Sequence, residues 1–172
     1  MTGKPQASEY LPQVEQYVKL VPEGEIIEIV KKRKDDTIAL LKGLSAEQAE
    51  YRYAEGKWSV KEVVGHFTDN ERVWAYRLLR IARNDPKGLV GYDENVFAAH
   101  APFGILPMSD IMEEYTAVRD ATIALLRSLP GDAWLRQGEF NNHPLSARAA
   151  AYVIVGHEIH HINVIKDRYL RR

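Results

Sequence analysis

The chain has 172 residues, of which 45% are hydrophobic and 27% charged, and its formal net charge at pH 7 is -1. This near-neutral balance argues against a broad electrostatic surface for nucleic acid or anionic membranes, and no run approaches the roughly 18 apolar residues of a transmembrane helix. The absence of cysteine excludes disulfides, thiolate nucleophiles and cysteine-ligated zinc, so any metal must have imidazole and oxygen ligands.

Residues 1–22 read as an N-terminal arm that packs across the outside of the helices of one domain, residues 1–172. Four long segments then show the apolar periodicity of amphipathic helices. They are residues 23–44, 59–83, 109–129 and 146–170. Each start is marked by a preceding proline or an N-capping serine, namely Pro22, Ser59, Ser109 and Ser146.

Residues 84–108 form a connection that is longer than a compact domain usually contains, and we expect a short helix around residues 93–99 within it. The connection is either a lid over a site or a crossover that covers apolar surface. Strand signals are weak, because the β-prone run at residues 152–155 lies inside a helical pattern. The sequence therefore predicts an all-α fold: a four-helix bundle with one long crossover between helices two and three.

The last helix contains His157-Glu158-Ile159-His160-His161, which matches the zinc-protease pattern H-E-x-x-H. At about 100° per residue, His157 and His161 lie roughly 40° apart on the apolar stripe of this helix. Glu158 falls on the flank of the stripe and His160 near its polar boundary. Two imidazoles on a core-facing stripe need partners, which favours a metal over the alternative of hydrogen-bonded core histidines.

The helix at residues 59–83 supplies a third histidine. His66 lies on the inward edge of its apolar stripe, and Asn70 points the same way one turn later. A bundle that packs this helix against the last one can bring His66 to His157 and His161. Three neutral imidazoles suit zinc, nickel or iron(II), with open positions for water or substrate. Taken alone, His66 would more often be a hydrogen-bonded core residue.

The protease interpretation lacks a third ligand. Eleven residues follow His161 in this sequence, and no glycine turns the chain back. Asp167 therefore stays on the same helix, about 80° around it from His157 and further along the chain. There is also no β-rich region to supply the edge strand that binds a peptide substrate. A metalloprotease is the least favoured function.

Two segments carry a family resemblance. KWSVKEVVGHFTDNERVWAYRLL, followed some 90 residues later by VIVGHEIHHINVI, resembles the DinB/YfiT-like superfamily of four-helix-bundle metalloproteins. The shared pattern is a Trp-Ser start of helix two, a histidine in its second turn, and an H-x-x-x-H pair in the last helix. YVKLVPEGEIIEIV and LLKGLSAEQAEYRYAEGKW extend the likeness over nearly the whole chain. The resemblance assigns the metal ligands to His66, His157 and His161, the three that helical geometry selects.

The resemblance implies a divalent metal completed by waters, with zinc or nickel favoured and iron as a further option, and a frequent homodimer. The family includes S-transferases that use low-molecular-weight thiols and an isomerase acting on maleylpyruvate. We therefore expect a cytoplasmic metal-dependent enzyme that acts on a small molecule, by transfer of an activated thiol or by hydrolysis. Residues that could support the ligands are Asn70, Glu71, Glu158 and His160.

Two alternatives to an enzyme stay open. One is a metal-binding or stress-linked bundle in which the metal holds helices two and four together. The other is an interaction module in which the histidines are core residues and no metal binds. Three protein ligands with exchangeable water favour catalysis, whereas a fourth protein ligand, such as His160 or Glu158, favours a structural site.

Overall fold

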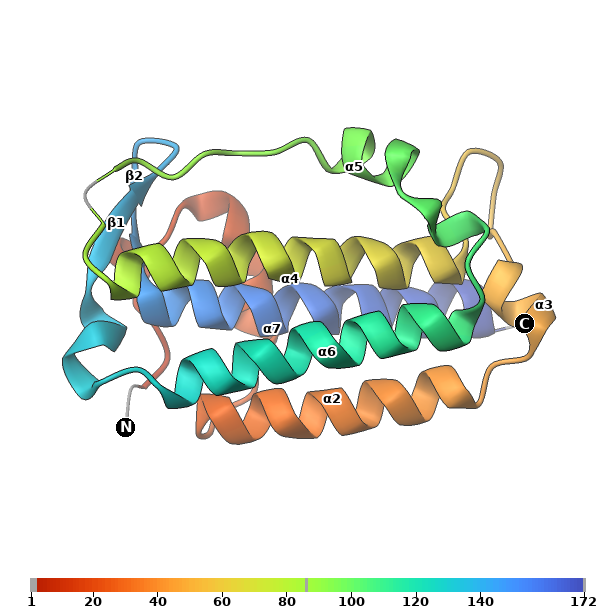
Figure 1. Cartoon of the computed structure of the whole chain (residues 1–172), viewed down its shortest axis with the longest axis horizontal. Helices are drawn as coiled ribbons and strands as arrows, with labels where there is room; N and C mark the ends of the chain where they lie inside the picture. Colours follow the sequence, from red (N-terminus) through yellow and green to blue (C-terminus); the bar gives the residue numbers. More distant parts are fainter. Residues whose placement is uncertain (1–2, 86, 172) are drawn as a thin grey trace.

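The structure is a computed structural model that describes residues 3–85 and 87–171. In this part of the chain, four long helices form a bundle, which confirms the predicted all-α fold (Figure 1). They are α2 (Ile26–Lys42), α4 (Val60–Ala82), α6 (Met108–Arg127) and α7 (Ala147–Val164), which continues as a π-helical turn, Ile165–Leu170. Helix α4 packs chiefly against α7 and α6, and α2 packs against α6 and α7. The two helices that carry the candidate ligands are therefore direct neighbours.

The helix starts follow the predicted caps in two of four cases. The Ser59 hydroxyl accepts a hydrogen bond from the Glu62 amide at 3.3 Å, and the Glu62 carboxylate accepts one from the Ser59 amide at 2.6 Å. Ser146 caps α7 in the same way, through the Ala149 amide. The predicted cap at Ser109 is wrong, because α6 already begins at Met108 and the Ser109 hydroxyl donates to Asp110.

The first predicted helix also begins later than expected. Helix α2 starts at Ile26 and has Glu25 as its N-cap. Gly24 has a φ of 139°, which no helix accommodates, so the residues after Pro22 form a turn instead. Two short elements at this end of the chain were not predicted, α1 (Glu15–Leu20) and α3 (Ala46–Glu50).

The long crossover lies along the outer side of α4 (Figure 1). It contains the predicted short helix, α5 (Glu94–His100), which Asp93 caps by accepting hydrogen bonds from the amides of residues 95 and 96. A 3-10 turn, Pro102–Gly104, follows. The Phe103 ring lies so close to Gly65 of α4 that a Cβ atom at position 65 would collide with the ring. The crossover is thus packed onto α4.

A β-hairpin precedes α7 and was not predicted. Strands β1 (Gln137–Phe140) and β2 (His143–Ser146) pair antiparallel, and the turn residues Asn141 and Asn142 have φ values of 50° and 61°. Asparagine tolerates this left-handed conformation, which a two-residue hairpin turn requires. The Leu89 amide donates to the Glu139 carbonyl at 3.1 Å, so the hairpin holds the start of the crossover.

The N-terminal arm packs against α7. The Glu9 carboxylate pairs with the Arg148 guanidinium and accepts a hydrogen bond from the Ser146 hydroxyl at 2.8 Å. At Gly156, a Cβ atom would collide with the Tyr17 carbonyl oxygen, so only glycine allows the arm to come this close. The first two residues of the arm lie outside the described part of the chain. Within the described residues, no helix has the length and apolar character needed to cross a membrane.

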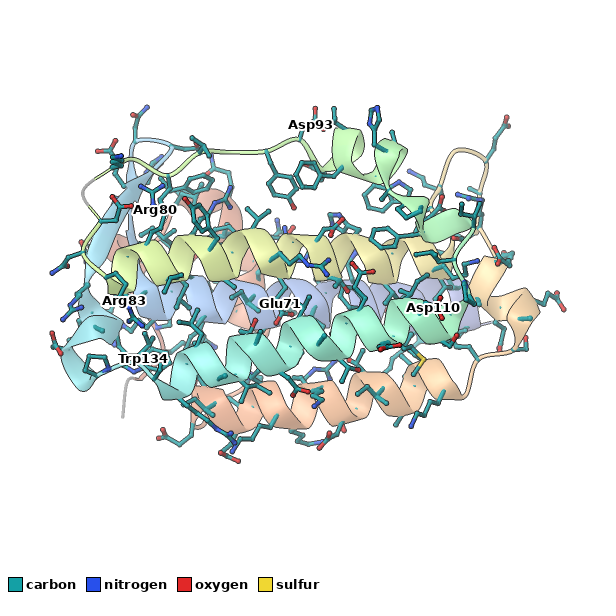
Figure 2. All side chains as sticks on the ribbon, viewed as in Figure 1. Glu71, Arg80, Arg83, Asp93, Asp110 and Trp134 are labelled. Atoms are coloured by element: carbon teal, nitrogen blue, oxygen red, sulfur yellow. The ribbon has the colours of Figure 1, made fainter. Side chains whose placement is uncertain are left out.

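A buried ion network links the bundle helices. Arg119 of α6 donates from Nε and Nη2 to the Glu71 carboxylate of α4 at 3.0 and 2.7 Å, and its Nη2 lies 2.8 Å from the Glu158 carboxylate of α7. The hydroxyls of Thr37 and Tyr115 also donate to Glu158. Figure 2 shows Glu71 in the interior of the bundle. One guanidinium therefore holds carboxylates from two other helices.

We expect Arg119→Met to lower the free energy of unfolding by about 3–5 kcal/mol, because it removes the cation that both buried carboxylates contact. Urea unfolding monitored by circular dichroism measures the change. The matched control is Lys34→Met, which removes a surface ion pair between Lys34 of α2 and Asp120 of α6 and should cost no more than about 1 kcal/mol. Equal effects of the two substitutions would contradict the role given to the network.

Candidate metal centre

Three histidine side chains converge where α4 meets α7. His66 comes from the second turn of α4, and His157 and His161 come from successive turns of α7. One ring nitrogen of each lies within 4.8 Å of the others, and the Nε2 atoms of His157 and His161 are 3.2 Å apart. The structure thus brings together the three residues that helical geometry selected.

Aromatic rings surround the three histidines. The Trp58 ring, one residue before the cap of α4, lies 4.7 Å from the His66 ring between centroids. The Tyr17 ring of the arm meets His157 edge-on at 5.1 Å and His160 at 5.6 Å. These rings restrict how far the imidazoles can turn, and they place the centre partly out of solvent.

Burial keeps the imidazoles neutral. It lowers the pKa of His66 to about 4 against the opposing charge of Glu94, and it lowers the pKa of His161 to about 3, with the neighbouring imidazoles adding to the effect. The pKa of His157 also lies well below its usual value, for the same reasons. At pH 7 each ring therefore has a free lone pair, which is the form that binds a metal.

The spacing of the two histidines on α7 fits a shared divalent ion. Two adjacent imidazole nitrogens that share an ion at about 2.0–2.1 Å lie roughly 2.8–3.4 Å apart in octahedral or tetrahedral arrangements. The 3.2 Å between the two Nε2 atoms on α7 falls in this range. Neutral nitrogen donors suit zinc, nickel and iron(II) better than calcium or magnesium, which prefer oxygen ligands.

The other predicted residues divide into two groups. Asn70 and His160 lie beside the histidines: the Asn70 Nδ2 donates to the Tyr92 hydroxyl at 2.7 Å, and the His160 ring is 5.0 Å from that of His161. Glu71 and Glu158 instead belong to the ion network with Arg119. Glu158 is 1% exposed, so its expected position on the helix flank is wrong. Its rotation of about 100° from His157 carries it into the bundle interior instead.

This placement of Glu158 bears on the H-E-x-x-H match. In a zinc protease the glutamate of the motif acts on the water at the metal. Here the Glu158 carboxylate is committed to Arg119, Tyr115 and Thr37. Among the described side chains, no imidazole forms a hydrogen bond or an ion pair with the Glu158 carboxylate. The geometry of the motif therefore differs from that of a protease.

The histidines line a pocket of about 400 Å³. The crossover contributes Tyr92 and Glu94 to its wall, and within the described chain Glu94 is the acidic side chain that lines it. Other lining side chains come from the arm, helix α4 and the hairpin, namely Tyr17, Trp58, Trp74, Arg77, Phe140 and Asn141. Glu94 lies in the connection, residues 84–108, that was expected to be either a lid or a crossover, whereas Arg77 was not predicted as a site residue. The available signal was spacing, since Arg77 follows His66 by 11 residues and so returns to the same helix face.

The metal-free protein should lose stability as the pH falls from about 6.5 toward 4. The three histidines have depressed pKa values in the folded state, so in this window the unfolded chain binds protons that the folded chain does not. Stability is fully present above the unfolded-state pKa. Urea titrations after chelator treatment, between pH 7 and 5, measure the effect. In a variant with asparagine at His66, His157 and His161, the free energy of unfolding should depend less on pH. The same pH dependence in both proteins would contradict the depressed pKa values of these histidines.

Solved structures of other proteins share the fold of this chain. YfiT from Bacillus subtilis, described as a probable metal-dependent hydrolase with an unusual four-helix bundle topology, matches with a TM-score of 0.71 and 20% identity, over 95% of this chain and 90% of YfiT. A DinB-like protein from Bacillus subtilis matches with a TM-score of 0.60 and 19% identity, over 83% of this chain and 87% of that one.

A mycothiol-dependent maleylpyruvate isomerase matches with a TM-score of 0.65 and 13% identity, over 80% of this chain and 58% of the isomerase. No curated protein sequence matches the chain. At these identities the solved structures show a shared fold. The sequence profile of the DinB superfamily, in contrast, matches residues 29–165, which is most of the chain. The protein therefore belongs to the DinB superfamily.

Proposed function

We propose that the protein is a divalent-metal-dependent enzyme that acts on a small molecule. The observation that carries this proposal is the convergence of three neutral imidazoles on a pocket of about 400 Å³. Three protein ligands leave positions free for water or substrate, which is typical of catalytic sites. The pocket has the volume of a small-molecule site. The description of YfiT as a probable metal-dependent hydrolase supports the same class of function.

His66, His157 and His161 would hold the metal, for which we propose zinc or nickel, with iron as the alternative. A divalent ion at this position supplies Lewis-acid chemistry, which lowers the pKa of water or of a thiol. Glu94 lies on α5 at the exposed rim of the pocket, and its charge acts on His66. We assign Glu94 as the general base that accepts the proton of the nucleophile.

Hydrolysis is the reaction that this arrangement supports best, because it requires a Lewis acid, a base and no second substrate besides water. Transfer of a low-molecular-weight thiol to an electrophile is the second candidate. The pocket extends beyond the histidines to Trp74 and Phe140, which leaves room for a thiol beside an electrophile. A homodimer and a cytoplasmic location also remain predictions.

The non-catalytic alternative requires a fourth protein ligand. Glu158 is a poor candidate because it is held by Arg119 in the bundle interior. His160 is the nearer candidate, since its ring lies 5.0 Å from that of His161 and lines the same pocket. The distinction between a catalytic and a structural metal therefore depends on His160.

Protein purified without a metal-affinity column should contain about one equivalent of divalent metal, or bind it on reconstitution. Replacing His66, His157 and His161 together with alanine should reduce the metal content below about a tenth of an equivalent, because each substitution removes a nitrogen donor. Elemental analysis makes the measurement. Two single variants serve as controls and should keep the metal, His160→Ala beside the cluster and His100→Ala on the exposed end of α5. Equal metal content in the triple variant would contradict the assigned ligands.

Glu94→Gln should lower turnover by about 10²–10⁴-fold while metal content is unchanged, because the general base is lost and the ligands are kept. The assay is a screen of metal-loaded protein with activated esters, and with glutathione plus an aryl halide, which also separates hydrolysis from thiol transfer. Asp93→Asn is the matched control and should keep its turnover. Asp93 lies directly before Glu94 at the start of α5 (Figure 2), and its side chain caps this helix, a role that asparagine can also fill. Unchanged turnover in Glu94→Gln would remove the residue from the mechanism.

A further inference from the structure

One buried cation in the histidine pocket has no counterion. Arg77 is 3% exposed, and its Nη2 donates to the Val90 carbonyl at 2.8 Å. Its Nε is buried and has no hydrogen-bond partner. Among the described residues no carboxylate forms an ion pair with it, whereas the buried Arg119 and the part-buried Arg148 each pair with glutamate. A buried charge without a partner is costly, so its presence calls for an explanation.

Aromatic rings hold the Arg77 guanidinium. Its central carbon lies 4.1 Å from the ring centroid of Phe140, 4.7 Å from that of Trp74 and 5.9 Å from that of Tyr92. Such contacts stabilise a cation and orient its plane without using its hydrogen-bond donors. Burial lowers the pKa of Arg77 to about 10, so the side chain is still protonated at neutral pH. The site is therefore a preformed cation whose buried Nε–H has no hydrogen-bond partner.

A second polar atom on the same face of α4 is also without a partner. Asn70 lines the same pocket, and its Oδ1 is buried and accepts no hydrogen bond. It lies one turn after His66 and about two turns before Arg77. The rise between the Cα atoms of His66 and Arg77 is roughly 16 Å, so the wall that carries both residues is elongated. An acceptor and then a cation thus follow the histidines along one wall.

We propose that Arg77 binds the carboxylate of an elongated small molecule whose reactive end lies at the three histidines. Asn70 accepts a hydrogen bond from an N–H or O–H group in the middle of that molecule. This inference rests on the proposed function and adds the chemical class of its substrate. The simpler explanation is that Arg77 only fastens the crossover through the Val90 carbonyl, in which case the charge of a ligand has no effect on its affinity.

The test compares ω-mercapto carboxylates with ω-mercapto alcohols of equal chain length, in propyl, hexyl and octyl series. The thiol engages cobalt(II) in cobalt-loaded protein, and the change in its absorption spectrum gives the dissociation constant. At one chain length or more, the acid should bind about tenfold more tightly than the alcohol, because Arg77 supplies a charge-assisted hydrogen bond. This preference should vanish in Arg77→Met. Arg72→Met, which removes a solvent-facing charge from the same helix, should keep it.

Equal affinities of acid and alcohol in the wild-type protein at every chain length would overturn the proposal, even if Arg77→Met fails to fold. A preference that persists in folded Arg77→Met would overturn it as well. If the protein takes up no cobalt, the proposed function fails and a second measurement decides on Arg77. In that case the NMR signal of the Arg77 Nε–H is followed in metal-free protein during titration with octanoate. A saturable shift that octanol does not cause supports the anion site, and no shift overturns it.

Discussion

The arrangement of the candidate centre depends on the buried contact between Arg119 and two glutamates. Glu71 lies on α4 five residues after His66, and Glu158 lies on α7 directly after His157. Because both carboxylates are buried, each must face the guanidinium on α6. Facing Arg119 fixes the rotation of each helix about its own axis. The rotation that satisfies the glutamates turns His66 and His157 toward the side where the arm and the crossover cover the bundle.

The fold was predictable where the sequence signal is local. Ser59 with Glu62, and Ser146 before an alanine-rich run, mark helix starts through contacts within one turn, and the H-x-x-x-H spacing places His157 and His161 on one stripe by helix geometry alone. The direction of Glu158 was not predictable, because its partner Arg119 lies on another helix and is 39 positions earlier in the chain. Its rotation of about 100° from His157 suggested a flank position, but the ion pair with Arg119 shows that this side of the helix faces the bundle interior.

The pocket around the histidines was less predictable than the histidines themselves. Phe140 and Asn141 come from a hairpin whose strands have four residues each, one of them containing a proline, so neither shows a clear alternation. The Asn-Asn pair was the one local signal for its turn. Tyr17 reaches His157 only because Gly156 lets the arm approach α7 closely. These elements are defined by contacts between distant segments, which a single sequence does not display.

We propose that three imidazoles, and no other protein group, hold a divalent metal at the contact between α4 and α7. X-ray absorption spectroscopy of the metal-loaded protein tests this claim most directly, because it reports the number of imidazole ligands. We predict three imidazoles, with the remaining positions occupied by water or other exchangeable oxygen ligands. A fourth imidazole that disappears in the His160→Ala variant, or a shell without imidazole, would contradict the account.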